Sequence, residues 1–155
     1  MSVELTPSGA RGRNIPRLPR PVMKMVQLLL SIRVRMAGGR LLNLTTAGSR
    51  TGKLHTVPLS CFQDKNGAWL VVASFGGTAK HPAWYVNMAH HPDQVWMERG
   101  KQKTQVVAES LNGEERAAAW RHITAAWPGY LAYQEQTDRE IPVVRLTPVG
   151  PERRS

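Results

Sequence analysis

The chain has 155 residues, enough for one domain with its own core and too few for two. No apolar run reaches the length of a membrane span, and the N-terminus has no uninterrupted apolar segment of the signal-peptide type, so we expect a cytoplasmic protein. The single cysteine, Cys61, excludes an intramolecular disulfide and a cysteine-rich metal site, and its apolar surroundings in the sequence predict a buried, inert thiol.

The net charge of +10 belongs mainly to an N-terminal arm. Residues 1–40 carry eight basic side chains and one acidic side chain, a net of +7, whereas residues 41–148 carry eleven basic and nine acidic side chains, a net of +2. A basic arm is usually a solvated leader, but one with an apolar stripe can lie on an anionic membrane or bind nucleic acid. We expect no nucleic-acid binding, because the domain itself is nearly neutral and has no recognisable motif of that kind.

One helix is predicted within the arm. Residues 1–21 are rich in proline and glycine and should be mobile or extended. A helical pattern follows over 22–36, with an apolar stripe at Val22, Val26, Leu29 and Leu30. We expect this stripe to pack on the domain, and a helix lying on a membrane surface is the alternative.

From residue 41 onward the pattern predicts mainly strands. Turn residues at 64–67 and 100–101 form two hairpins, while Pro82 and Asn112 suit the starts of two helices. Six strands with helices between the hairpins predict a small, mainly antiparallel barrel. The expected units are an arm over 1–39, a domain over 40–148 and a tail over 149–155. The predicted strands are 41–46, 54–63, 69–75, 94–99, 103–109 and 142–146, and the predicted helices are 81–89, 112–126 and 130–137.

A glycine-punctuated basic loop joins the first two predicted strands. Gly48 and Gly52 allow a tight turn whose backbone N–H groups face one way, and Arg50 and Lys53 add positive charge. Such a loop suits a phosphate or a run of carboxylates, although a solvated hairpin turn would have the same composition. It is not a P-loop, because the Gly-x4-Gly-Lys-Ser/Thr spacing is absent and a strand, not a helix, follows.

A second loop of this kind follows the third predicted strand. It contains the Gly76-Gly77 pair and Lys80, and it leads into a helix whose first N–H groups could face an anion. Two such loops make a credible site if the barrel brings them together. The simpler interpretation is a strand-to-helix connection with Trp84 in the core.

Familiar catalytic arrangements are missing from the sequence. The five histidines do not fall into a metal-binding spacing, so we expect no metal, and no acid pair suggests a glycosidase. An enzyme of this sequence would therefore take its chemistry from a cofactor. A polyanionic cofactor would account for both loops.

Four sequence blocks together carry a family resemblance. They are LTTAGSRTGKLHTVPL, VVASFGGTAKHPAWYVNM, NGEERAAAW and WPGYLAYQEQTDREIPVVRL. In this order and at these distances they resemble the deazaflavin (F420)-dependent nitroreductase family, over roughly residues 40–147. The resemblance implies a mainly β (α+β) split β-barrel of the FMN-binding-like kind, with an N-terminal helix and helices inserted before the last strand.

The resemblance also implies which residues form the site. The basic loop would hold the phosphate and oligoglutamate tail of F420, and the end of the third strand would pass beside the deazaflavin ring. Trp127, Tyr130 and Tyr133 would line the acceptor side, and their spacing predicts one shared helical face; core packing is the alternative. Tyr130, or a water held by Ser74, would supply a proton. The implied cofactor-binding residues are Ser49, Arg50, Thr51, Gly52, Lys53, His55, Ala73, Ser74, Phe75, Gly76, Lys80, Trp84 and Asn87.

We therefore expect an oxidoreductase that transfers a hydride from reduced F420 to a quinone-like or nitroaromatic acceptor. Two alternatives stay open: FMN as the cofactor of the same barrel, and a protein that carries F420 without turnover. The basic arm adds the expectation that the protein contacts the anionic inner face of the cell membrane peripherally. Each basic residue near such a surface contributes about 1 kcal/mol to the free energy of binding.

Overall fold

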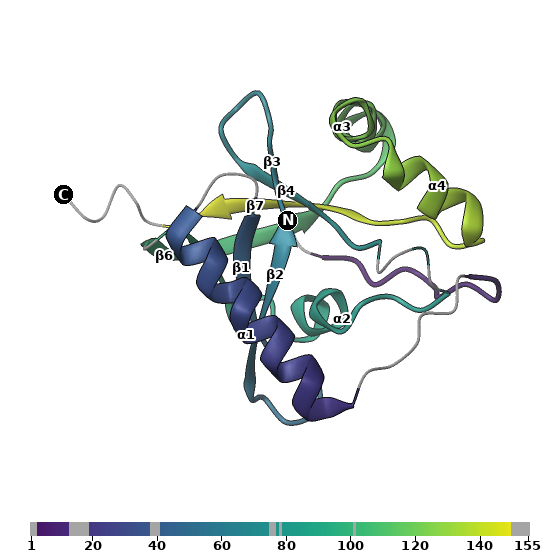
Figure 1. Cartoon of the computed structure of the whole chain (residues 1–155). Coiled ribbons are helices and arrows are strands. Elements are labelled where there is room, and N and C mark those ends of the chain that lie inside the picture. Colours follow the sequence, from purple (N-terminus) through teal and green to yellow (C-terminus); the bar gives the residue numbers. More distant parts are fainter. Residues whose placement is uncertain are drawn as a thin grey trace.

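The computed structural model describes residues 3–12, 19–37, 41–74, 77, 79–100 and 102–149, with the backbone alone for 30–37. Most element bounds lie within a few residues of the predicted ones (Figure 1). The helices are α1 (Arg20–Ala37), α2 (Ala83–His90), α3 (Gly113–Ala126) and α4 (Gly129–Gln136). The strands are β1 (Leu41–Ala47), β2 (Leu54–Ser60), β3 (Phe62–Gln63), β4 (Trp69–Val72), β5 (Val95–Arg99), β6 (Gln102–Ser110) and β7 (Val143–Pro148).

One continuous segment of chain closes the sheet into a barrel. The strand order is β2-β1-β5-β6-β7-β4-β3, and neighbouring strands pair antiparallel. The two outermost strands, β2 and β3, are consecutive in sequence and separated only by the buried Cys61. Since β2 pairs with β1 while β3 pairs with β4, the bend at Cys61 joins the two edges of the sheet. The predicted split β-barrel is confirmed, and the strand predicted over 54–63 is divided by this bend.

Two apolar clusters fill the barrel and the space beneath its helices. The larger includes Leu42 and Leu44 of β1, both fully buried, together with Tyr85 and Met88 of α2. The smaller lies beneath α3 and α4 and is centred on the fully buried Ile123. Burying one such aliphatic side chain contributes about 1.5–3 kcal/mol, so these clusters hold α2, α3 and α4 on the sheet.

The first residues of the arm form a strap that is fixed on the domain. Val3 is buried in the larger cluster, and the amide of Glu4 donates to the Ser110 hydroxyl at 3.0 Å. Farther along, the amide of Gly9 donates to the Ala79 carbonyl at 2.8 Å. In Figure 1 this strap, residues 3–12, passes between α2 and the connection from α4 to β7. Residues 3–12 are therefore packed on the domain, within the segment that the sequence predicted as mobile or extended.

Helix α1 lies along β1 and β2 while leaving apolar side chains uncovered. Val22, Val26 and Leu29 of the predicted stripe are 46%, 39% and 61% exposed, and Met25 beside them is 64% exposed. Leu30, the last member of that stripe, lies outside the residues whose side chains are described. The expectation that the domain would bury the stripe is therefore wrong for its described members. No described helix is long and apolar enough to cross a bilayer.

The start of α3 differs from the predicted one in its capping chemistry, and its end lies at the predicted residue. Asn112 occupies the predicted N-cap position, but its side chain makes no capping hydrogen bond. At the other end α3 stops at Ala126, and Trp127 has a non-helical backbone. Proline disfavours helical geometry in the residue before it, so Pro128 separates α3 from α4.

Candidate functional site

The basic loop is an ordered hairpin turn between β1 and β2. The Gly52 amide donates to the Gly48 carbonyl at 2.8 Å, and the Gly48 amide donates to the Lys53 carbonyl at 2.8 Å. Gly52 has φ of 73°, a conformation that favours glycine. The Lys53 amide donates to the Thr51 hydroxyl at 3.2 Å, so this hydroxyl stabilises the turn itself.

A buried asparagine on α2 holds this turn in place. The side-chain Oδ1 of Asn87 accepts a hydrogen bond from the Ser49 amide at 3.0 Å, and its Nδ2 donates to the Thr46 hydroxyl at 3.1 Å. Both polar atoms of the predicted site residue Asn87 are therefore used within the protein. Through these two hydrogen bonds the Asn87 side chain supports the basic turn.

The remaining polar groups of the turn suit an anion. The side chains of Arg50 and Lys53 are exposed, and no acidic residue occurs between residues 45 and 63. The backbone N–H groups of Arg50 and Thr51 have no hydrogen-bond partner among the described residues. Two N–H donors and two cationic side chains are thus available on a pre-formed backbone.

The end of β4 is the second predicted part of the site, and the loop that follows it leads to α2. Ala73 and Ser74 are buried, and their carbonyls accept hydrogen bonds from Arg139 Nη1 at 3.0 Å and Nη2 at 2.7 Å. Gly77 closes a turn by donating its amide to the Ser74 carbonyl at 2.9 Å. Phe75 and Gly76 lie outside the described residues.

His81 links this second loop to the strap. Its Nε2 is 2.8 Å from the Thr6 carbonyl, and its Nδ1 is 3.2 Å from Arg139 Nη1. Since the guanidinium can only donate, Nδ1 is the acceptor and Nε2 carries the proton. Burial is the main cause that lowers the pKa of His81, and the positive charge of Arg139 lowers it further. His81 is therefore neutral in this arrangement.

Two tyrosines of α4 form an aromatic face over the end of the barrel. Tyr130 is buried and contacts Phe62 edge-on at a centroid distance of 6.0 Å, and it contacts half-buried Tyr133 edge-on at 5.9 Å. The backbone of Tyr133 lies against Gly77, where an added Cβ would come within 2.8 Å of the Tyr133 carbonyl oxygen. Close packing at Gly77 thus brings α4 onto the second loop.

Desolvation raises the pKa of the Tyr130 phenol, and a hydrogen bond with the Ser60 side chain opposes this effect. Like an ordinary tyrosine, Tyr130 is protonated at neutral pH, and its raised pKa makes the phenol a weaker acid. The role of Tyr130 as a proton donor stays a prediction.

Trp127 does not share the face of the tyrosines. It lies between α3 and α4 and is 49% exposed, with its indole folded over Gly129. The prediction of one helical face for all three aromatic residues is wrong, because Pro128 interrupts the helix between Trp127 and Tyr130.

The other predicted site residues divide between surface and core. His55 is exposed at the start of β2 and lies beside the basic turn, since a Cβ on Gly48 would be 3.3 Å from its Nε2. Lys80 is exposed on the second loop. Trp84 is buried in the larger apolar cluster, with an edge-on contact to Tyr85.

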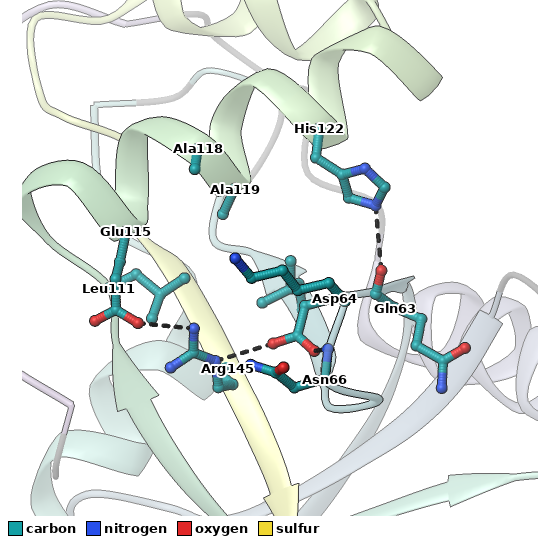
Figure 2. Close-up of a pocket in the computed structure, with 11 residues that line it drawn as sticks. Gln63, Asp64, Asn66, Leu111, Glu115, Ala118, Ala119, His122 and Arg145 are labelled. Carbon is teal, nitrogen blue, oxygen red and sulfur yellow. Dashed lines mark hydrogen bonds and ion pairs between the residues drawn. The ribbon is translucent and has the colours of Figure 1, made fainter.

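A separate pocket of about 410 Å³ lies between α3 and the β3–β4 hairpin. Two of its acidic groups are paired with an arginine: Arg145 donates to Asp64 at 3.1 Å and to Glu115 at 3.0 Å, as Figure 2 shows. His122 bonds the Gln63 carbonyl at 3.1 Å in the same view. No predicted site residue lines this pocket. Among the described residues no group of histidine, cysteine and acidic side chains could hold a metal ion.

Sequence reasoning missed Arg139, His81 and the strap. Arg139 carries no local signal, because the Ala73 and Ser74 carbonyls that it bonds lie 66 and 65 positions away in the sequence. Neither His81 nor the strap carries a local signal, because their partners lie far away in the sequence.

The comparisons with known proteins point to one family. The family model of the F420H(2)-dependent quinone reductases matches residues 20–148. The F420H(2)-dependent quinone reductase Rv1261c of Mycobacterium tuberculosis is 35% identical over 107 residues, which span 67% of this chain and 70% of that protein. A second M. tuberculosis protein, Rv3178, provisionally named for the same activity, is 34% identical over 99 residues, covering 64% of this chain and 82% of its own length.

A solved F420-H2-dependent reductase, FDR-A, superposes with a TM-score of 0.63 at 38% identity, covering 73% of this chain and 98% of that one. The family match includes α1 as well as the barrel. The resemblance read from the four sequence blocks is confirmed. The chain belongs to the F420H(2)-dependent quinone reductase family, and it is an oxidoreductase whose cofactor is coenzyme F420.

Proposed function

We propose that the protein transfers a hydride from reduced F420 to a quinone, with the cofactor held between the basic turn and the end of β4. The observation that carries this proposal is the pre-formed turn of residues 48–53, which Asn87 fixes in place. F420 carries a phosphodiester and several carboxylates, and the turn offers Arg50, Lys53 and two N–H donors to them. The residues present therefore fit the anionic part of the cofactor.

The deazaflavin end would lie beside Ala73 and Ser74. When bound, reduced F420 supplies the hydride from C5 of its deazaflavin ring. The protein contributes position: the buried end of β4 is hydrogen-bonded through consecutive carbonyls, and Tyr133 packs on the same loop at Gly77. Holding the reactants in one geometry can lower a reaction barrier by several kcal/mol.

The acceptor would lie against Tyr130 and Tyr133. A flat, conjugated quinone ring can stack on or beside these rings. Tyr130 would keep its phenolic proton at neutral pH and give it to the reduced acceptor oxygen, with a water held by Ser74 as the alternative donor. Nitroaromatic compounds have the same flat shape and are the second acceptor class that we propose to test.

We further infer that α1 contacts an anionic membrane, where lipid-soluble quinones occur. The support is the set of exposed apolar side chains on α1, next to the basic residues Arg20 and Lys24. An interfacial helix combines these two features. Binding should weaken as salt is added, since screening reduces the electrostatic part.

A titration with F420 tests the cofactor site. Arg50→Ala should weaken F420 binding by about 1–3 kcal/mol, the range for a lost charge-assisted contact, and Lys53→Ala should have a smaller effect. Both losses should shrink with a deazaflavin that lacks the glutamate tail. Arg121→Ala, at an exposed arginine of α3, is the matched control and should bind F420 normally.

The same titration with FMN, followed by menadione-dependent oxidation of reduced F420, tests the reaction. We expect binding of F420 in preference to FMN and turnover with menadione. Binding of F420 without turnover of any quinone would support a carrier in place of a reductase. Unchanged affinity in both turn variants would show that the turn does not hold the cofactor.

A further inference from the structure

A buried arginine near the C-terminal end of the chain holds the end of β4. Arg139 is only 3% exposed, and it donates through Nη1 to the Ala73 carbonyl at 3.0 Å and through Nη2 to the Ser74 carbonyl at 2.7 Å. We propose that Arg139 is a positioning residue, which fixes this backbone so that the cofactor ring and the acceptor meet in reactive geometry. This inference rests on the proposed function, which places the deazaflavin beside Ala73 and Ser74.

The chemistry of the contact explains why an arginine occupies this position. β4 ends at Val72, so the Ala73 and Ser74 carbonyls lie beyond the β4–β7 strand pairing. Buried carbonyls need donors, and the planar guanidinium presents two parallel N–H groups to two consecutive acceptors. A lysine ammonium is a compact point charge and lacks this fork.

Arg139 is itself held from several sides. Its amide donates to the Thr137 hydroxyl at 3.3 Å, and its carbonyl accepts from Gln134 Nε2 at 2.7 Å. Its Nη1 also contacts His81, which reaches the Thr6 carbonyl of the strap. These contacts on its backbone and on its guanidinium therefore hold the side chain in one conformation.

The segment that Arg139 fixes touches both predicted halves of the site. Ser74 lies on the cofactor side, and Gly77, which bonds the Ser74 carbonyl, packs against the backbone of Tyr133 on the acceptor side. A shift of Ser74 would thus change the distance between donor and acceptor. A misplacement of about 1 Å can cost on the order of a hundredfold in rate.

Arg116 offers a matched control. It is a half-buried arginine whose Nη2 donates to the Ile141 carbonyl at 2.7 Å, in the same connection before β7, and it lies over Trp120. No contact joins its guanidinium to the end of β4 among the described residues. Arg139→Lys and Arg116→Lys therefore both replace a desolvated guanidinium. The Arg139 guanidinium contacts the end of β4, whereas no described contact joins Arg116 to it.

The experiment compares these variants with the full-length wild type in amide hydrogen exchange, F420 affinity and single-turnover hydride transfer to menadione. For Arg139→Lys we expect the Ala73 and Gly77 amides, which are hydrogen-bonded to the Pro142 and Ser74 carbonyls, to exchange faster on the order of tenfold. Hydride transfer should be slower by roughly ten- to a hundredfold. F420 affinity should change by only about threefold or less, because the tail contacts lie at the basic turn. Arg116→Lys should lower the melting temperature without either local effect.

His81→Gln provides a second variant if Arg139→Lys does not fold. It leaves Arg139 in place and alters the contact between Arg139 Nη1 and the side chain at position 81. The Ala73 and Gly77 amides should therefore exchange faster, and the rate of hydride transfer should fall less than in Arg139→Lys. This inference would be overturned if Arg139→Lys and Arg116→Lys showed the same amide exchange rates and the same rate of hydride transfer while the wild type behaved normally. The proposed function would stand in that case. A wild type that does not bind F420 would overturn the proposed function and the catalytic part of this inference together.

Discussion

The side chain of Asn87 links α2 to the basic turn, and its removal has a calculable cost. Asn87→Ala deletes one hydrogen bond of 3.0 Å to the Ser49 amide and one of 3.1 Å to the Thr46 hydroxyl. Each such bond contributes about 0.5–1.5 kcal/mol net, so we expect a loss of roughly 1–3 kcal/mol in the free energy of unfolding. For a chain of this size that loss lowers the melting temperature by about 2–12 °C.

Cofactor binding should fall in the same variant for a different reason. Without the Asn87 side chain the Ser49 amide has no hydrogen-bond partner among the described residues, and the turn loses this bond to α2. Arg50 and Lys53 then have to be ordered when the cofactor binds, so we expect F420 affinity to fall several-fold.

Urea unfolding and an F420 titration measure the two effects, and Asn112→Ala serves as the control. Asn112 is exposed and its side chain makes no capping bond, so its replacement should change stability by less than about 0.5 kcal/mol. If Asn87→Ala matched Asn112→Ala in both measurements, the asparagine bridge would contribute nothing and the supporting role assigned to it would be refuted.

Three further predictions follow from the site and its surroundings. Tyr130→Phe and Tyr133→Phe should leave F420 affinity nearly intact and lower steady-state turnover with some acceptors; untouched turnover with quinones and nitroaromatics alike would mean that these rings only pack. The pKa of His81 is lowered by its burial and by Arg139, with Thr6 and the Tyr85 ring on its other sides, so its neutral form favours folding. This contribution is present above the unfolded pKa of about 6.5 and is lost as the pH falls through the lower folded value. Urea midpoints of the wild type should therefore decline below pH 6.5 more steeply than those of His81→Gln, and parallel curves would contradict the assignment. Met25→Glu and Leu29→Glu should reduce co-sedimentation with anionic vesicles without lowering the melting temperature, whereas Leu131→Glu on α4 should leave vesicle binding unchanged; equal binding by all three would place the contact elsewhere than on α1.

Local sequence patterns were sufficient for most elements of the barrel. Alternating apolar residues and the turn at 64–67 predicted the hairpin of β3 and β4, and Pro82 and Pro128 marked helix ends. These signals act over a few residues, because backbone conformation there depends on neighbouring side chains and on proline geometry. The basic turn was predicted for the same reason, since glycine and its flanking charges are adjacent in the chain.

The sequence was less informative where a residue's partner is distant. Cys61 was recognised as buried, but its place at the bend that joins both sheet edges depends on the pairing of β2 with β1 and of β3 with β4. Trp127 had the right spacing for the aromatic face, and the break at Pro128 removed it from that face. Asn87 was predicted as a cofactor residue, and the folded chain uses both ends of its amide to hold the turn.

The sequence by itself predicted the family and the order of the elements, because these depend on motifs and on periodicity along the chain. Through the family resemblance it also implied coenzyme F420, with FMN as the alternative. The tertiary structure alone decided how the site is supported. Arg139 reaches the carbonyl of Ala73, 66 positions away in sequence, and His81 joins it to the strap. Such contacts form only when folding removes water from both partners, because a buried carbonyl or guanidinium must then find its hydrogen bonds inside the protein.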